Sequence, residues 1–144
     1  MKTIICYLFI LVVVALSFNH HTEAAATDAE VGKKATEKCI KEGSLGGEDT
    51  KRILNGDIFS TKYKETSEKL KCFLLCYYKH IGIIGADGKQ KPEVVLKYLE
   101  SRFPNDKDKI KPALAKCTNI KSSNPCQVVY QFEDCVIKNV SNMK

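Results

Sequence analysis

Two cysteines four residues apart constrain the fold of this chain more than any other feature. Cys72 and Cys76 lie in the stretch KCFLLCYY, among large apolar side chains. The apolar residues around them recur at helical spacing, which predicts a helix over about residues 67–81. On a helix, Cβ atoms four residues apart are separated by roughly 5–6 Å, whereas a disulfide needs them within about 4.5 Å. The two cysteines therefore share a helix face and are not expected to bond to each other.

The first 26 residues have the features of a secretory signal peptide. One lysine precedes an apolar run from Ile4 to Leu16, and alanines at positions 24–26 supply a small-residue cleavage site. The apolar run is shorter than the ~20 residues that span a bilayer as a helix. We therefore expect a secreted, extracellular protein without membrane insertion, in which residues 27–144 form one domain. A retained membrane anchor is the alternative.

Removal of this segment takes Cys6 away and leaves six cysteines. An even number in an oxidising compartment predicts three disulfides. Cys126 and Cys135 lie on the expected last helix, nine residues apart in the sequence. They are thus about 13 Å apart along the helix and point in opposite directions, so they should bond to two different neighbours. Excluding the two impossible pairs leaves ten of about 15 connectivities open.

Helical periodicity and capping residues predict an all-α fold. Apolar stripes bounded by Gly, Asn or Pro predict six helices, over about residues 27–42, 48–54, 67–81, 92–103, 106–118 and from 125 onward. Pro112 falls inside the fifth pattern, so that helix begins either after Asp106 or near Lys111. Asn124 is expected to cap the last helix, with Pro125 at its first position.

Charge and the scarcity of histidine argue against several classes of function. The net charge of +6 is spread through every segment, which favours solvated helix faces over a nucleic-acid-binding surface. His80 is the one histidine of residues 27–144, which leaves little for a catalytic triad. Neither a Gly-x-Ser-x-Gly elbow nor the acidic alternation of a calcium loop is present. We therefore expect neither an enzyme nor a cofactor.

A metal site is a second interpretation of the paired cysteines. Cys72, Cys76 and His80 follow one another at intervals of four residues and share a helix face. Thiolate together with imidazole is zinc chemistry. The secretory context and the lack of a fourth ligand at suitable spacing favour disulfides instead. No metal site is expected, and His80 is interpreted as an ordinary residue at a helix end.

The spacing of the six cysteines resembles that of the insect odorant-binding proteins, the family that includes the pheromone-binding proteins. The framework is Cys39-x32-Cys72-x3-Cys76-x40-Cys117-x8-Cys126-x8-Cys135. The x3 gap and the final x8 gap are the most specific marks of that family. The resemblance covers essentially all of residues 27–144.

This resemblance implies the disulfides Cys39–Cys76, Cys72–Cys126 and Cys117–Cys135, and a compact bundle of six helices around an internal hydrophobic cavity. It also implies a carrier that transports an odorant, a pheromone or a lipid-like molecule through an aqueous fluid such as sensillum lymph. Odorant receptors are then possible partners, and we expect a monomer or a weak homodimer.

Apolar stripes on three helices supply the candidate ligand-binding residues, although plain core packing is the competing interpretation for each of them. They are Phe73, Leu74, Tyr77, Ile81, Val95, Leu99, Val129, Phe132 and Val136. The alternative function is a secreted protein-interaction effector, such as a venom or glandular toxin or inhibitor, on the same helical scaffold. A large exposed apolar patch would favour that alternative.

Overall fold

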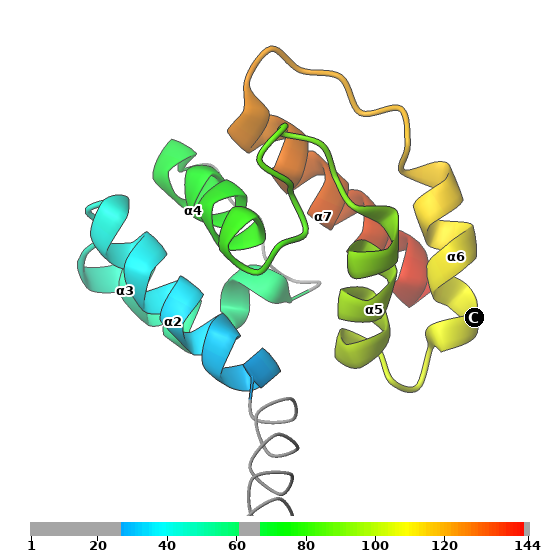
Figure 1. The fold of residues 1–144 in the computed structure, drawn as a ribbon, viewed down its shortest axis with the longest axis horizontal. Helices are drawn as coiled ribbons and strands as arrows, with labels where there is room; N and C mark the ends of the chain where they lie inside the picture. Colours follow the sequence, from blue (N-terminus) through cyan, green and yellow to red (C-terminus); the bar gives the residue numbers. More distant parts are fainter. Residues whose placement is uncertain (1–26, 61–66, 143–144) are drawn as a thin grey trace, which may run out of the picture. The chain divides into compact units, whose positions relative to one another are not determined.

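The computed structural model describes residues 27–60 and 67–142, and the fold of these residues is all-α, as predicted. The predicted signal peptide lies outside them and stays a prediction. Six α-helices and one 3₁₀ helix follow one another: α2 (Thr27–Glu42), α3 (Gly47–Leu54), η1 (Asp57–Phe59), α4 (Glu68–His80), α5 (Pro92–Arg102), α6 (Lys107–Lys116) and α7 (Pro125–Asn142) (Figure 1). The chain divides into two compact units after Val31, and everything below concerns the second, Gly32–Lys144.

The expected helices differ from the observed ones mainly at their ends. α6 begins at Lys107, so the earlier of its two expected starts is the observed one and Pro112 lies inside the helix. A proline there removes the hydrogen bond to the carbonyl of Asp108. Both residues are exposed, so water can satisfy that carbonyl. The short helix η1 was not expected from the sequence.

The start of α7 matches the expectation closely. The Asn124 side-chain oxygen accepts hydrogen bonds from the backbone N–H groups of Cys126 at 2.9 Å and Gln127 at 3.4 Å. Two of the N–H groups that a helix start leaves without intrahelical partners are thereby satisfied.

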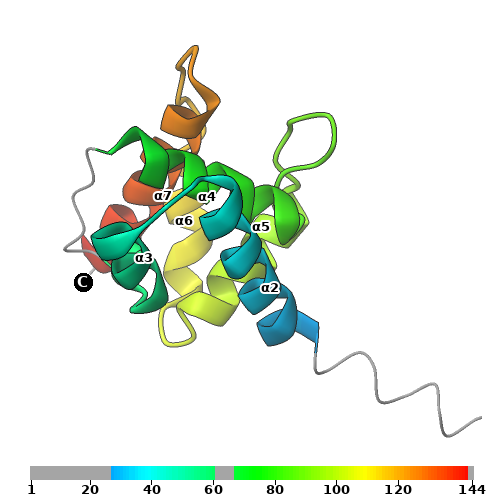
Figure 2. The same cartoon turned by 90° about the vertical axis from the view of Figure 1, so that its left-hand side faces the viewer.

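The core lies mainly between α4 and α7, which pack along each other (Figures 1 and 2). α6 packs on α7, and α5 packs on α6. One stripe of each central helix is almost fully buried: Leu70, Phe73, Leu74 and Tyr78 on α4, and Val129, Phe132, Val136 and Val140 on α7.

Three disulfides join the helices, and they are the three pairs that the family resemblance implies. Cys76 ties α4 to Cys39 on α2, and Cys72 ties α4 to Cys126 on α7. Cys135, further along α7, bonds to Cys117 at the end of α6. Each such bond stabilises a small secreted domain by typically 2–4 kcal/mol, mainly by restricting the unfolded chain.

Glu133 of α7 is a carboxylate buried in this core, with 2% of its surface exposed. It accepts hydrogen bonds from the guanidinium of Arg102 on α5 and from the hydroxyl of Tyr78 on α4. The same guanidinium donates to the backbone carbonyl of Phe59 in η1 and lies over that residue's ring, 5.0 Å from its centroid. This network joins η1, α4, α5 and α7 through polar bonds inside an otherwise apolar core.

Two tyrosines beside this network are held in their neutral form. Burial raises the pKa of Tyr78 well above the ordinary value of 10.0, and the negative charge of Glu133 raises it further. Burial followed by the charge of Glu133 likewise raises the pKa of Tyr98. A phenolate at either position would lie in an apolar region next to a carboxylate.

We expect Arg102→Met to lower the free energy of unfolding by about 3–5 kcal/mol, because it leaves Glu133 buried without its cation. Urea unfolding followed by circular dichroism measures the change. Arg52→Met is the matched control, since Arg52 forms an exposed pair with Glu48 at 3.8 Å and should cost about 1 kcal/mol or less. Equal losses in the two variants would contradict a central role for the network.

Buried Tyr78 and partly buried Tyr98 predict a loss of stability at high pH. Their pKa values are raised in the folded state, so their contribution is fully present below the unfolded value of 10.0 and is lost as the pH rises above it. Phenolate absorbance should show two tyrosines that ionise only when the protein unfolds. If all the tyrosines ionised near pH 10 in the folded protein, the assigned burial would be wrong.

Candidate ligand-binding site

A cavity of about 540 Å³ lies where two loops meet the ends of four helices. This volume falls within the ~300–1,000 Å³ that small-molecule sites usually occupy. The loops are 81–91, between α4 and α5, and 117–124, between α6 and α7, and both lie toward the top of Figure 1. The lining residues are Leu75, Ile84, Gly88, Gln90, Pro92, Val95, Leu114, Cys117, Thr118, Ile120, Ser122, Ser123, Pro125, Val128, Val129 and Phe132.

The cavity has an apolar floor and a polar, uncharged rim. Its floor is formed by buried side chains from one loop and two helices: Ile84, Val95, Val129 and Phe132. Its rim carries exposed side chains that can form hydrogen bonds: Gln90, Thr118, Ser122 and Ser123. The described lining includes no charged residue. An apolar chain is therefore accommodated inside, and a polar end group finds donors and acceptors at the mouth.

The first loop is folded back on itself, which directs Ile84 to the cavity. The N–H of Gly85 donates to the carbonyl of Lys89, and the N–H of Lys91 donates to the carbonyl of Ile83, both at 2.8 Å. Gly88 has a φ of 75°, in the left-handed region where a side chain would be strained. The turn buries Ile84 while leaving the polar residues around it in water.

The second loop is anchored at both ends by disulfides. It follows Cys117, which bonds to Cys135, and leads into Cys126, which bonds to Cys72. Asn124 adds a third attachment, because its side-chain amide donates to the carboxylate of Glu68 on α4 at 2.5 Å. Since Cys117 itself lines the cavity, the cross-links hold the wall of the site as well as the helices.

Three of the nine ligand-binding residues expected from the sequence line this cavity: Val95, Val129 and Phe132. The other six do not line it. Phe73, Leu74, Leu99 and Val136 are buried in the core, and Ile81 is partly buried just after α4. Tyr77 packs against the rings of Phe59 and Phe73, with centroids 5.7 and 6.0 Å away. Ligand contact by any of the nine stays a prediction.

The wall also includes residues that sequence periodicity did not single out. α4 contributes Leu75, which lies outside the main apolar stripe of that helix, and α6 contributes Leu114. The loops contribute Ile84, next to the buried Ile83, and Ile120. Branched aliphatic residues in a loop were the available signal, because loops are mostly exposed and such side chains are usually buried against other apolar residues.

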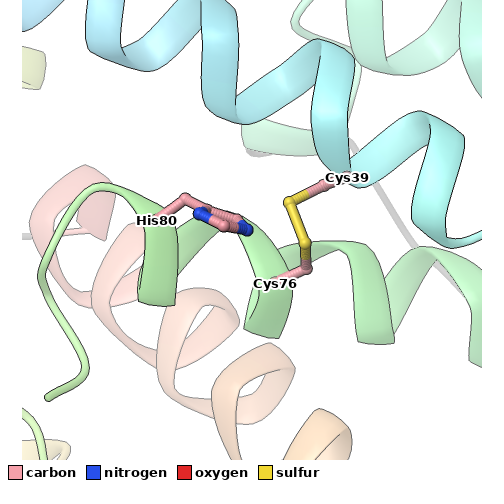
Figure 3. A group of neighbouring side chains, drawn as sticks. All are labelled: Cys39, Cys76 and His80. Carbon is pink, nitrogen blue, oxygen red and sulfur yellow. A yellow bond between two sulfur atoms is a disulfide. The ribbon is translucent and has the colours of Figure 1, made fainter. Parts of the chain in front are cut away.

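Of the three residues in the sequence pattern, Cys76 and His80 come together in space, with Cys39 in the place of Cys72. Figure 3 shows the imidazole of His80 beside the Cys39–Cys76 disulfide, where α2 faces α4. One ligand atom from each residue lies within 4.8 Å of the others. Cys72 bonds to Cys126 and takes no part. With both sulfurs of the group oxidised, this site offers a metal no thiolate.

Comparison with known proteins identifies the family. The sequence model of the PBP/GOBP family, the odorant-binding proteins, matches residues 22–139. The chain belongs to this family. Its members are carriers of small hydrophobic molecules and not enzymes, which agrees with the expectation that the chain has no catalytic activity.

Individual relatives match over most of their length. General odorant-binding protein 56a of Drosophila melanogaster is 29% identical over 128 residues, which cover 89% of this chain and 84% of that protein. Odorant-binding protein 10 of Aedes aegypti is 24% identical over 105 residues, covering 73% and 70% respectively. Among solved structures, the fatty acid binding protein OBP56a from the oral disk of the blowfly Phormia regina superposes with a TM-score of 0.64. It is 28% identical, and the match covers 86% of this chain and all of that one.

The helices of residues 27–60 and 67–142 were also compared with the requirements of a membrane span. None of them is both long enough and apolar enough to cross a bilayer.

Narrowing the cavity should weaken the binding of an apolar ligand. Val128 lines the cavity on α7, so Val128→Phe places a ring in the space that a ligand would fill. We expect affinity for an environment-sensitive fluorescent dye to fall roughly tenfold, which corresponds to about two methylene groups left unburied. Val94→Phe is the control, since Val94 is partly buried but does not line the cavity. If the Val128→Phe and Val94→Phe variants bound the dye with equal affinity, the dye would not bind in this cavity.

Proposed function

We propose that this protein is a secreted carrier that binds fatty acids and similar aliphatic amphiphiles and transports them through an aqueous fluid such as sensillum lymph. The observation that carries the proposal is the cavity with its apolar floor and polar, uncharged rim. Burial of each methylene group there is worth about 0.8 kcal/mol, which suits a ligand made mainly of hydrocarbon. The solved relative from Phormia regina, a fatty acid binding protein, supports the same ligand class.

Lysines beside the rim support an acidic head group. Lys89 and Lys91 flank the rim residue Gln90, and Lys121 precedes the rim residue Ser122. All three are exposed, and none forms an ion pair with another described residue. An ammonium group on a long flexible side chain can approach a carboxylate held at the mouth of the cavity. The ligand would then lie with its tail inside and its acid group at the rim.

Secretion rests on the apolar segment and small-residue site within residues 1–26. Odorant receptors as partners, and a monomeric or weakly dimeric state, are further predictions of the same proposal. The rival interpretation, a secreted protein-interaction effector, requires a large exposed apolar patch. Among the described residues, the exposed large apolar side chains are Val31 on α2 and Leu54 on α3. Two such residues are too few for a patch of that kind.

The proposal predicts a chain-length series in a dye-displacement assay. Affinity for saturated fatty acids should rise about fourfold for each added methylene, the equivalent of 0.8 kcal/mol. The rise should end at the chain length that fills the cavity. Equal displacement of the dye by acids of every length, or no dye uptake at micromolar protein, would contradict binding in the apolar cavity.

The lysines are tested by comparing each acid with the alcohol of equal chain length. Lys89→Gln with Lys121→Gln should reduce the preference for the acid by about two- to fivefold, the range expected of exposed charge pairs. The preference should also shrink as salt is added. Lys41→Gln together with Lys51→Gln is a control of equal charge change, because both residues are exposed and neither α2 nor α3 contributes a residue to the lining of the cavity. An unchanged preference in the rim variant would remove the acid head group from the proposal while leaving the carrier function intact.

A further inference from the structure

Asn139 opens the one Asn-x-Ser/Thr sequon of the sequence, Asn139-Val140-Ser141. Such a tripeptide is the acceptor for N-linked glycans in secreted proteins. All three residues belong to the last turns of α7. Asn139 is half-buried, Val140 is buried and Ser141 is exposed. The sequon is therefore part of a packed helix rather than of a loop.

The side-chain amide of Asn139 is already engaged in the folded protein. Cys135 lies one turn earlier on the same face of α7, and Nδ2 of Asn139 donates to its carbonyl oxygen at 2.9 Å. Nδ2 also lies 3.6 Å from the sulfur of Cys135 and 3.8 Å from the sulfur of Cys117. A primary amide has two N–H donors, so one serves the carbonyl and the other is directed to the sulfurs. The nitrogen that would carry a glycan is thus held at the Cys117–Cys135 cross-link.

The helix also separates the two side chains that N-glycosylation requires together, the amide and the hydroxyl two residues on. In an extended segment, residues two apart lie on the same face. In an α-helix they do not face each other. The side chain of Val140, which is 1% exposed, holds this turn of α7 against the core. The folded chain therefore does not present the amide of Asn139 and the hydroxyl of Ser141 side by side.

We propose that Asn139 is an N-glycosylation acceptor whose use is decided by the Cys117–Cys135 disulfide. It accepts a glycan before this bond closes and is withdrawn once the bond has closed. The inference rests on secretion, which is part of the proposed function. Both cysteines precede Asn139 in the chain, so they enter the oxidising compartment first. Closure of a disulfide across 18 residues therefore competes directly with glycan transfer.

The transfer changes the same contacts that the disulfide supports. Nδ2 forms a bond to the anomeric carbon of a lipid-linked oligosaccharide, the bond from that carbon to the lipid diphosphate breaks, and one amide proton passes to a base. The substituted amide keeps one N–H in place of two. A sugar on Nδ2 also needs space beside the two sulfurs. A glycosylated chain should therefore close Cys117–Cys135 poorly, so the two modifications oppose each other.

The test is expression of the full chain in insect cells, with the glycan detected as a shift in mass and mobility that peptide-N-glycosidase removes. We expect the wild-type protein to be secreted largely without a glycan. Cys117→Ala together with Cys135→Ala should give a protein glycosylated at Asn139. Adding Asn139→Gln to this pair should abolish the shift.

The matched control is Cys39→Ala together with Cys76→Ala. It also removes one disulfide, but that disulfide links α2 to α4, whereas the amide of Asn139 lies at the sulfurs of Cys117 and Cys135. This variant should stay largely without a glycan. The comparison separates the specific effect of one cross-link from a general loss of stability.

Two further measurements separate this inference from secretion. Lys107→Thr completes a sequon at Asn105, in the exposed turn before α6, and a glycan there reports entry into the secretory pathway. The purified proteins are also treated with a soluble N-glycosyltransferase and UDP-glucose, which requires no export. With Lys107→Thr added, Asn105 should be modified in every variant, and Asn139 only where Cys117–Cys135 is missing.

A glycan on most wild-type molecules that have all three disulfides closed would overturn the inference. Equal modification of Asn139 in the two disulfide variants would overturn it too. So would an unmodified Asn139 in the Cys117→Ala, Cys135→Ala protein while Asn105 is modified. Because the purified proteins are compared as well, a failure of secretion is distinguished from a failure of this inference.

Discussion

The organisation of this protein follows from two cysteines on one face of α4 that are too far apart to bond to each other. Each must bond to another helix, and they do so at different ends of the same face. Cys76 holds α2 and Cys72 holds α7. α4 therefore lies between two neighbours to which it is covalently attached. Its apolar stripe packs mainly against α7, so the strongest cross-linking and the densest packing occur around the same helix.

Most of the packed core and the cavity occupy different regions of the bundle, although Val129 and Phe132 belong to both. The interior between α4 and α7 is filled by side chains and by the Arg102–Glu133–Tyr78 network. The cavity lies at the end of the bundle, where loops replace helices as the wall. Loops are usually the mobile part of a fold. Here a disulfide at each end of residues 117–126 limits that freedom, so the site can be lined by loop residues and still keep its shape.

The α2–α4 face combines a covalent cross-link with polar side chains beside it. The disulfide stabilises the fold in an oxidising fluid. The same geometry that allows the bond brings His80 and Glu42 beside the sulfurs, because helical spacing places all four side chains on facing surfaces.

The sequence was enough to predict the six α-helices, the cap at Asn124 and the two cysteine pairs that cannot form disulfides. Each of these features depends on residues that lie close together in the sequence. Periodicity also indicated which face of α4 is buried, yet it did not say what that face would meet. Leu74 lies beside Glu133 and Ile137 of α7, and Phe73 lies on the side of Cys39. Leu75, from outside the stripe, lines the cavity. Glu133 likewise gave no local sign that Arg102 would neutralise it in the core. Such assignments depend on which segments distant in sequence come to lie together, and that becomes visible once the helices have packed.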